Sequence, residues 1–268
     1  MHKPSSTRDY LVALLIATAL TAFFSLYLFI RRGYLFDGPP TADALYVPNK
    51  AIVGAGTVLL AFTFLIGPIV RYFDRFDQWL SYRKEIGIVG GLLVVSHAII
   101  SYFLLPLKFP SSRFTFESVP FVAGLIGVAL LIFLFIISFK KVIEVMDGSR
   151  WWFLQRWGLR LVILFTLIHV FAMKWSGWMK WLAQGGGKPT AELANPQMAG
   201  LGILVMLFVT WVVIVRLYES VFIFRNVGLT IKEIAMDEQL KARGRRFFIG
   251  SFWILVILYA LVITRWLF

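Results

Sequence analysis

Seven long apolar runs, separated by polar loops, constrain what this chain can fold into. A membrane-crossing helix needs about 20 mostly apolar residues, whereas barrel strands would alternate in polarity. Hydrophobic residues make up 59% of the chain and charged residues 15%, which is too apolar for a soluble domain. The sequence therefore predicts an all-α, polytopic transmembrane bundle of about seven helices. The predicted spans are Tyr10–Ile30, Ala51–Val70, Gly87–Leu107, Val119–Phe139, Gly158–Lys174, Met198–Val215 and Phe247–Thr264.

We divide the chain into an N-terminal helix with its loop (1–50), a helical core (51–181) and a C-terminal helix pair with a basic loop (182–268). The first run lacks a small-residue cleavage site, so we expect an uncleaved membrane helix. The stretch 218–246 is either an amphipathic surface segment or a solvated loop. Gly185–Gly187 lacks the context of a phosphate loop and is expected to be a flexible external loop.

Basic residues are distributed unequally between the two sides of the predicted bundle. Of the 27 Lys and Arg residues, 17 fall on the side of the N-terminus and 9 on the other, with Arg160 left out. The positive-inside rule then places the N-terminus in the cytoplasm and the C-terminus outside. The net charge of +13 fits loops that face anionic membrane lipid, so no nucleic-acid partner is expected.

Two of the three histidines, His97 and His169, lie deep inside apolar runs. No Asp or Glu falls within the seven runs and the chain has no Cys, so these imidazoles are candidate functional groups. Counted from Gly87 and Gly158, both lie about 15–17 Å from the cytoplasmic end, near the midplane. A pair of neutral imidazoles at equal depth suits axial ligation of a haem iron, one from each side.

Two glycines share a helix face with the histidines. Gly90 lies seven residues before His97, and Gly158 lies eleven before His169, so their missing side chains would leave room for a porphyrin edge. In the alternative interpretation, the histidines form hydrogen bonds between helices, and Gly87 with Gly91 is a helix-packing motif.

Four basic residues stand at the predicted cytoplasmic ends of the histidine helices. They are Arg83, Lys84, Arg156 and Arg160. Such cations would stabilise the propionates of a haem, or a flavin phosphate on a partner. The positive-inside bias explains the same residues without any ligand.

Three stretches resemble the ferric-reductase-like transmembrane domain. They are LLAFTFLIGPIVR (Leu59–Arg71), RKEIGIVGGLLVVSHAIISY (Arg83–Tyr102) and WWFLQRWGLRLVILFTLIHVF (Trp151–Phe171). The order of a helix-closing proline, a basic pair and a mid-helix histidine is most similar to the haem-binding membrane subunit of bacterial methionine sulfoxide reductase systems. The resemblance covers under half of the chain, and the seventh helix lies outside the six-helix pattern of that family.

The resemblance implies that His97 and His169 bind haem b in a bacterial inner-membrane protein. Electrons would come from a flavoprotein carrying FMN or from a quinol, and would pass to a periplasmic or membrane partner. Gln155 stands where the family has a second-haem histidine, so we expect one haem rather than two. The rival interpretation is a non-redox transporter or assembly protein with structural histidines.

Overall fold

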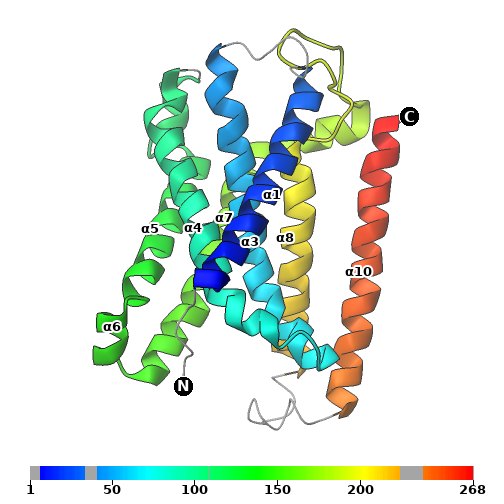
Figure 1. The fold of residues 1–268 in the computed structure, drawn as a ribbon. Helices are drawn as coiled ribbons and strands as arrows, with labels where there is room; N and C mark the ends of the chain where they lie inside the picture. Colours follow the sequence, from blue (N-terminus) through cyan, green and yellow to red (C-terminus); the bar gives the residue numbers. More distant parts are fainter. Residues whose placement is uncertain (1–6, 34–40, 108, 224–237, 268) are drawn as a thin grey trace.

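The computed structural model describes residues 7–33, 41–107, 109–223 and 238–267, and in these ranges every long element is a helix (Figure 1). The seven long helices are α1 (Thr7–Arg32), α3 (Thr41–Phe73), α4 (Gln78–Phe103), α5 (Val119–Ile137), α7 (Gly148–Gln184), α8 (Leu201–Tyr218) and α10 (Glu238–Leu267). The short elements are η1 (Leu105–Leu107), η2 (Ser111–Phe114), α6 (Lys140–Val145) and the π-helical η3 (Glu219–Ile223). All seven long helices are long and apolar enough to cross a membrane, which confirms the predicted all-α transmembrane bundle.

Several helices extend well beyond the apolar runs that predicted them. Helix α3 begins at Thr41, ten residues before its apolar run, and α4 begins at Gln78. Helix α7 begins early because the Asp147 carboxylate accepts hydrogen bonds from two backbone N–H groups of its first turn, each at 3.1 Å. With 37 residues, α7 is about 55 Å long, which exceeds the roughly 30 Å of a bilayer core. Polar helix ends therefore project beyond the apolar layer.

The helices alternate in direction through the bundle (Figure 1). Helices α1, α4, α7 and α10 begin at one end, which we call the basic end, and they finish at the opposite end. Helix α3 is central, because it packs against α1, α4, α8 and α10, while α5 pairs with α7. The N- and C-termini lie at opposite ends, as the prediction of seven spans requires.

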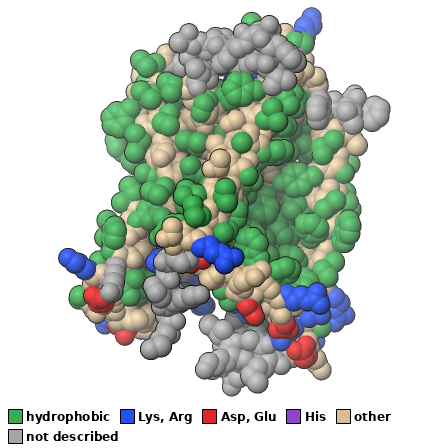
Figure 2. Space-filling model, viewed as in Figure 1, with side chains coloured by type: hydrophobic (Ala, Val, Ile, Leu, Met, Phe, Trp, Pro, Cys, Tyr) green, Lys and Arg blue, Asp and Glu red, His purple; other side chains and the backbone are tan. Residues whose placement is uncertain are grey.

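The surface of the bundle has the polarity of an integral membrane protein. Figure 2 shows apolar side chains over the middle of the visible face, with most of the charged side chains near the basic end. Large apolar residues such as Leu92, Trp253 and Leu261 are more than half exposed. Lipid, rather than water, is the solvent that suits this surface.

Residues 224–237 of the stretch 218–246 lie outside the described residues, so the choice between a surface segment and a loop falls there. Residues 219–223 of this stretch form η3. The basic run Lys241–Arg246 belongs to the first turns of α10. The predicted loop at Gly185–Gly187 is present as a connection after α7, where Gly185 adopts a φ of 75°.

Close helix crossings depend on glycines that the sequence suggested for a different role. A methyl group at Gly90 of α4 would lie 2.9 Å from Leu59 Cβ and 3.1 Å from the Gly56 carbonyl oxygen of α3. At Gly158 of α7 it would lie 2.5 Å from Leu134 Cδ2 of α5. Both glycines thus let helices approach closely, as small residues do in membranes. The prediction that they leave room for a porphyrin edge is not supported, because neighbouring helices already fill that space.

Two buried carboxylates correct the expectation that the spans contain none. Glu85 of α4 is 1% exposed and Glu219 of η3 is 0% exposed. The helices continue past the apolar runs, which brings both residues inside the spans. Glu219 accepts hydrogen bonds from the guanidinium groups of Arg71 and Arg216, with 2.9 Å between Arg71 Nε and Oε1. This buried Arg–Glu–Arg cluster joins α3 to the end of α8.

Replacing Gly90 with Leu should destabilise the bundle by about 1–3 kcal/mol, because α3 and α4 cannot separate without losing their packing. Thermal unfolding in detergent measures the effect. Gly250→Leu in α10 is the matched control, since a methyl group there would meet nothing within 4 Å. An unchanged melting temperature for Gly90→Leu would contradict the described crossing.

Replacing Glu219 with Gln should destabilise the protein by about 3–5 kcal/mol, because two guanidinium groups lose their shared counter-charge. Denaturant unfolding in mixed micelles measures the change. Glu238→Gln is the control, because its salt bridge with Lys241 is exposed and such pairs contribute little. Equal stability of the two variants would show that the cluster is not a stabilising contact.

Candidate functional site

His97 is held by a polar contact between α4 and α3. Its Nδ1 lies 3.0 Å from Asn49 Oδ1 and 3.3 Å from Ser101 Oγ, and Asn49 Nδ2 donates to Ser101 Oγ at 3.0 Å. Asn49 is 1% exposed, so its amide depends on these partners. Because an amide oxygen only accepts hydrogen bonds, we assign the imidazole proton to Nδ1 of His97. The Nε2 atom of His97 is then unprotonated.

His169 is held in the same way by α5. Its Nδ1 lies 2.6 Å from the Pro120 carbonyl oxygen, which can only accept, so Nδ1 carries the proton and donates it. A methyl group at Gly124 would lie 2.9 Å from His169 Nδ1. Glycine at this position therefore gives the ring access to the first turn of α5, and His169 Nε2 is left unprotonated.

The two imidazoles therefore share one chemical arrangement. In each, Nδ1 donates to a fixed oxygen and Nε2 has a lone pair, as is usual for metal-bound histidine. The rings of His97 and His169 lie close enough for their charges to interact. His97 Nε2 also lies 3.5 Å from Ser101 Oγ, the outer limit of a hydrogen bond. This pair could provide two axial ligands to one iron.

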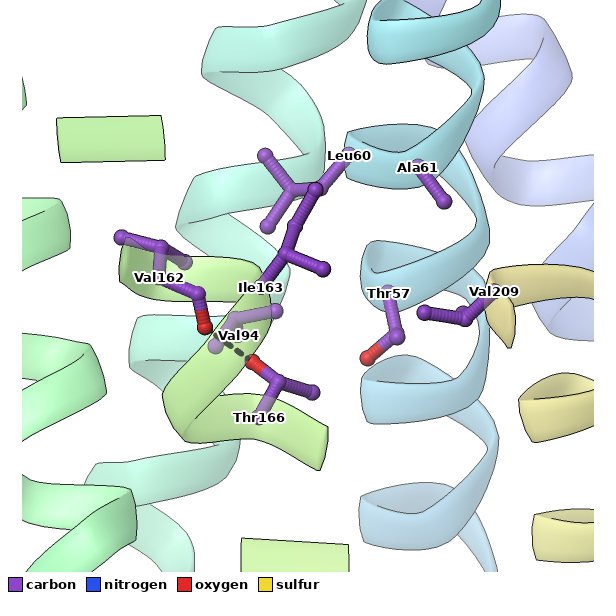
Figure 3. A pocket seen from close by; sticks show the side chains of 8 residues that line it. All are labelled: Thr57, Leu60, Ala61, Val94, Val162, Ile163, Thr166 and Val209. Atoms are coloured by element: carbon purple, nitrogen blue, oxygen red, sulfur yellow. Dashed lines mark hydrogen bonds between the residues drawn. The ribbon is translucent and has the colours of Figure 1, made fainter. Parts of the chain in front are cut away.

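A small apolar cavity of about 10 Å³, room for about one water molecule, lies between α3, α4, α7 and α8 (Figure 3). Val94 lies three residues before His97, and Thr166 three before His169, so the cavity and the histidines share helix faces. Helices α4 and α7 are not among the closely packed helix pairs. The lining residues are Thr57, Leu60, Ala61, Val94, Val162, Ile163, Thr166 and Val209. Neither histidine is among the lining residues, so the cavity lies about one helical turn from each ring.

The residues that anchor the histidines lie toward the opposite end of the bundle. Asn49 lies near the start of α3 and Pro120 in the first turn of α5, and both helices begin at that end. The depth near the midplane that was predicted from Gly87 and Gly158 stays a prediction, although α4 and α7 begin nine and ten residues before those glycines. The prediction that both rings lie near one level also stays a prediction.

The four predicted propionate-binding cations lie at the basic end, away from the histidine pair. Arg83 precedes His97 by 14 residues, or about 21 Å of helix, and Lys84 follows it directly. Arg160 lies 4.8 Å from the Trp157 ring centroid and donates to Ser220 Oγ at 3.4 Å, which directs it toward the end of α8. Arg156 is exposed on the turn before. None of the four is placed to contact a group bound between His97 and His169.

Gln155 has a structural contact that accounts for its presence. Its Nε2 donates to Ser138 Oγ at 2.8 Å and lies 3.4 Å from the Leu134 carbonyl oxygen. The side chain thus links α7 to the end of α5.

Sequence reasoning missed the groups that orient the histidines. Ser101 could have been found, because it lies one helical turn after His97. Asn49 was assigned to a loop because it precedes the apolar part of α3, and Pro120 and Gly124 carry no signal that links them to His169. In the described ranges no three His, Asp or Glu side chains gather as a metal-binding group, whereas a haem takes only two axial ligands from the protein.

Comparison of the chain with protein-family models and with curated protein sequences gives no match. The resemblance to the ferric-reductase-like domain therefore rests on the motifs quoted above.

The assigned tautomers can be measured by ¹⁵N NMR of histidine-labelled protein without added haem. We expect Nδ1-protonated neutral rings for His97 and His169. Asn49→Leu should shift His97 toward a mixture of tautomers, because only the Ser101 hydroxyl, which both donates and accepts, remains beside Nδ1. His169 is the internal control and should not change. A protonated Nε2 on His169 in the wild type would contradict the assignment.

Proposed function

We propose that this protein is a membrane electron-transfer subunit that binds one haem b between α4 and α7. His97 and His169 would be the axial ligands, each through Nε2. The observation that carries the proposal is the shared anchoring of Nδ1, to Asn49 Oδ1 in one ring and to the Pro120 carbonyl in the other. Such contacts fix ring orientation and raise ligand basicity.

The surrounding residues fit a porphyrin in kind. The cavity walls are aliphatic, with two threonine hydroxyls, and lie on the faces that carry the histidines. Its volume of about 10 Å³ is far below the roughly 300–1,000 Å³ of ligand pockets, so binding of the group would require α4 and α7 to separate. These two helices are not a closely packed pair, although both pack against α5.

When bound, a haem supplies a reversible one-electron couple. The chain's own residues would determine how that couple is used. With His97 and His169 both holding the group, its chemistry would be outer-sphere electron transfer rather than activation of a bound substrate. Helix packing keeps the rings in place, and the aliphatic walls exclude water from the iron.

We propose a flavoprotein with FMN, or a membrane quinol, as electron donor, and a periplasmic or membrane reductase as partner. The position of the histidines near the opposite end favours an acceptor on that side. With the N-terminus in the cytoplasm of a bacterium, that side is the periplasm.

Two observations favour the rival function, a non-redox transporter or assembly protein. The contacts of His97 and His169 join helices, as purely structural histidines also do. Glu85 also favours a transporter, because a carboxylate inside the membrane is a candidate functional group in such proteins. Its Oε2 is buried and has no hydrogen-bond partner among the described residues.

A reduced-minus-oxidised visible spectrum of purified protein, expressed with ample haem, distinguishes the two functions. We expect sharp low-spin b-type bands in the wild type and their loss in His97→Ala and His169→Ala, since each change removes one axial ligand.

Gln155→Ala is the matched control and should keep the bands, because the Gln155 amide donates its hydrogen bond to Ser138 at the end of α5 and not to a histidine. A colourless wild-type protein would overturn the electron-transfer function. Retention of low-spin bands in either histidine variant would overturn the ligand assignment.

A further inference from the structure

The first turns of α10 carry a basic run directly before the apolar part of the helix. Four of the six residues from Lys241 to Arg246 are Lys or Arg. They lie at the basic end of the bundle, where α10 stands at its edge (Figure 1). A basic cluster beside a membrane helix is typical of segments that bind anionic lipid, but the positive-inside bias also produces such clusters. The placement of each cation on the helix distinguishes the two explanations.

Contacts with the end of α3 fix which face of α10 meets the bundle. Lys241 Nζ lies 2.9 Å from each carboxylate oxygen of Asp74, and Arg245 Nε donates to the Tyr72 carbonyl oxygen at 2.9 Å. Gly244 is buried between these two cations, and a methyl group there would overlap the Tyr72 ring. Two of the four cations in the run therefore have partners within the protein, and their face of the helix is covered.

The other two cations, Arg243 and Arg246, lie on the outward face of α10. They follow Lys241 by two and five residues, which places them about 200° and 140° round the helix from it. Both residues are exposed, and neither forms a salt bridge with a carboxylate in the part of the chain that the structure describes. Arg246 Nε donates to the Ala242 carbonyl of its own helix at 3.4 Å, a long hydrogen bond. These two guanidinium groups are available to an external anion.

The outward face is apolar along the rest of α10. Gly250 lies seven residues, or about 10.5 Å, after Arg243 on the same side, and a methyl group there would meet nothing within 4 Å. Ile254, Ile257 and Leu261 continue this face and are each more than half exposed. An open apolar surface thus begins about two turns below the two arginines. A phospholipid has the same order of groups, with a phosphate above its acyl chains.

We propose that the outward face of α10 binds an anionic phospholipid, with the phosphate held by Arg243 and Arg246. Side chains three residues apart on a helix are neighbours, so both guanidinium groups can reach one phosphate, whose oxygens match their planar donors. The acyl chains then lie along Gly250, Ile257 and Leu261. Such a lipid would fix the depth of α10 in the membrane, since this helix packs mainly against α8 and α3. The inference does not depend on the haem function.

The test is native mass spectrometry of the full-length protein in a neutral detergent, titrated with phosphatidylglycerol and with phosphatidylcholine of the same acyl chains. The wild type should bind its first phosphatidylglycerol at least about tenfold more tightly than phosphatidylcholine, since two arginines at a membrane surface supply more than that ratio. Arg243→Gln/Arg246→Gln should bind the two lipids equally. Lys141→Gln/Arg150→Gln is the matched control, because it removes the same charge from exposed positions at the same end, and it should behave as wild type.

Thermal unfolding in the same detergent provides a second measurement. Phosphatidylglycerol should raise the melting temperature of the wild type and of the control more than phosphatidylcholine does, because it binds the folded state more tightly. The Arg243→Gln/Arg246→Gln variant should respond equally to both lipids. The single variants Arg243→Gln and Arg246→Gln should each lose part of the preference, which keeps the test decisive if the double variant does not fold.

Three results would overturn the inference. A wild type that binds both lipids equally tightly does not select an anionic headgroup. A glutamine double variant that keeps the wild-type preference places the lipid elsewhere on the protein. Displacement of bound phosphatidylglycerol by an equal concentration of inorganic phosphate would show a site for a free anion, in which the apolar face of α10 has no part.

Discussion

Polar groups inside this bundle must find their hydrogen bonds within the protein, because lipid offers none. The deepest polar contacts follow from that requirement. Asn49 meets His97, the Pro120 carbonyl meets His169, and Glu219 meets two arginines. Each contact joins two elements distant in the chain, so the same bonds that satisfy the polar groups also fix the relative positions of α3, α4, α5, α7 and the end of α8.

The chemistry open to the histidines depends on these partners. An imidazole that donates from Nδ1 to a fixed oxygen has its Nε2 lone pair available and its ring orientation set. Under the proposed function, these two rings would be the ligands of one haem. The Arg71–Glu219–Arg216 cluster is a separate charged contact and lies at the basic end of the bundle.

Helix extent explains most of the differences between prediction and structure. Apolar runs mark the part of a helix that lies in lipid, but α4 and α7 continue for nine or ten residues outside it. That extension brought Glu85 inside a span. The functions assigned to Gly90 and Gly158 failed for another reason. A shared helix face does not say what lies opposite, and for these glycines it is another helix.

The sequence by itself determined the fold class, the number of spans and the two histidines inside apolar runs. Hydropathy and residue type are local properties, and they determine which segments are stable in a bilayer. Only the tertiary structure decided which nitrogen of His97 and His169 is anchored and which residues anchor it. Those relations join residues that are 48 and 49 positions apart, on helices whose packing no local pattern records. Helix contacts and buried polar bonds select one arrangement among the many that seven apolar helices allow.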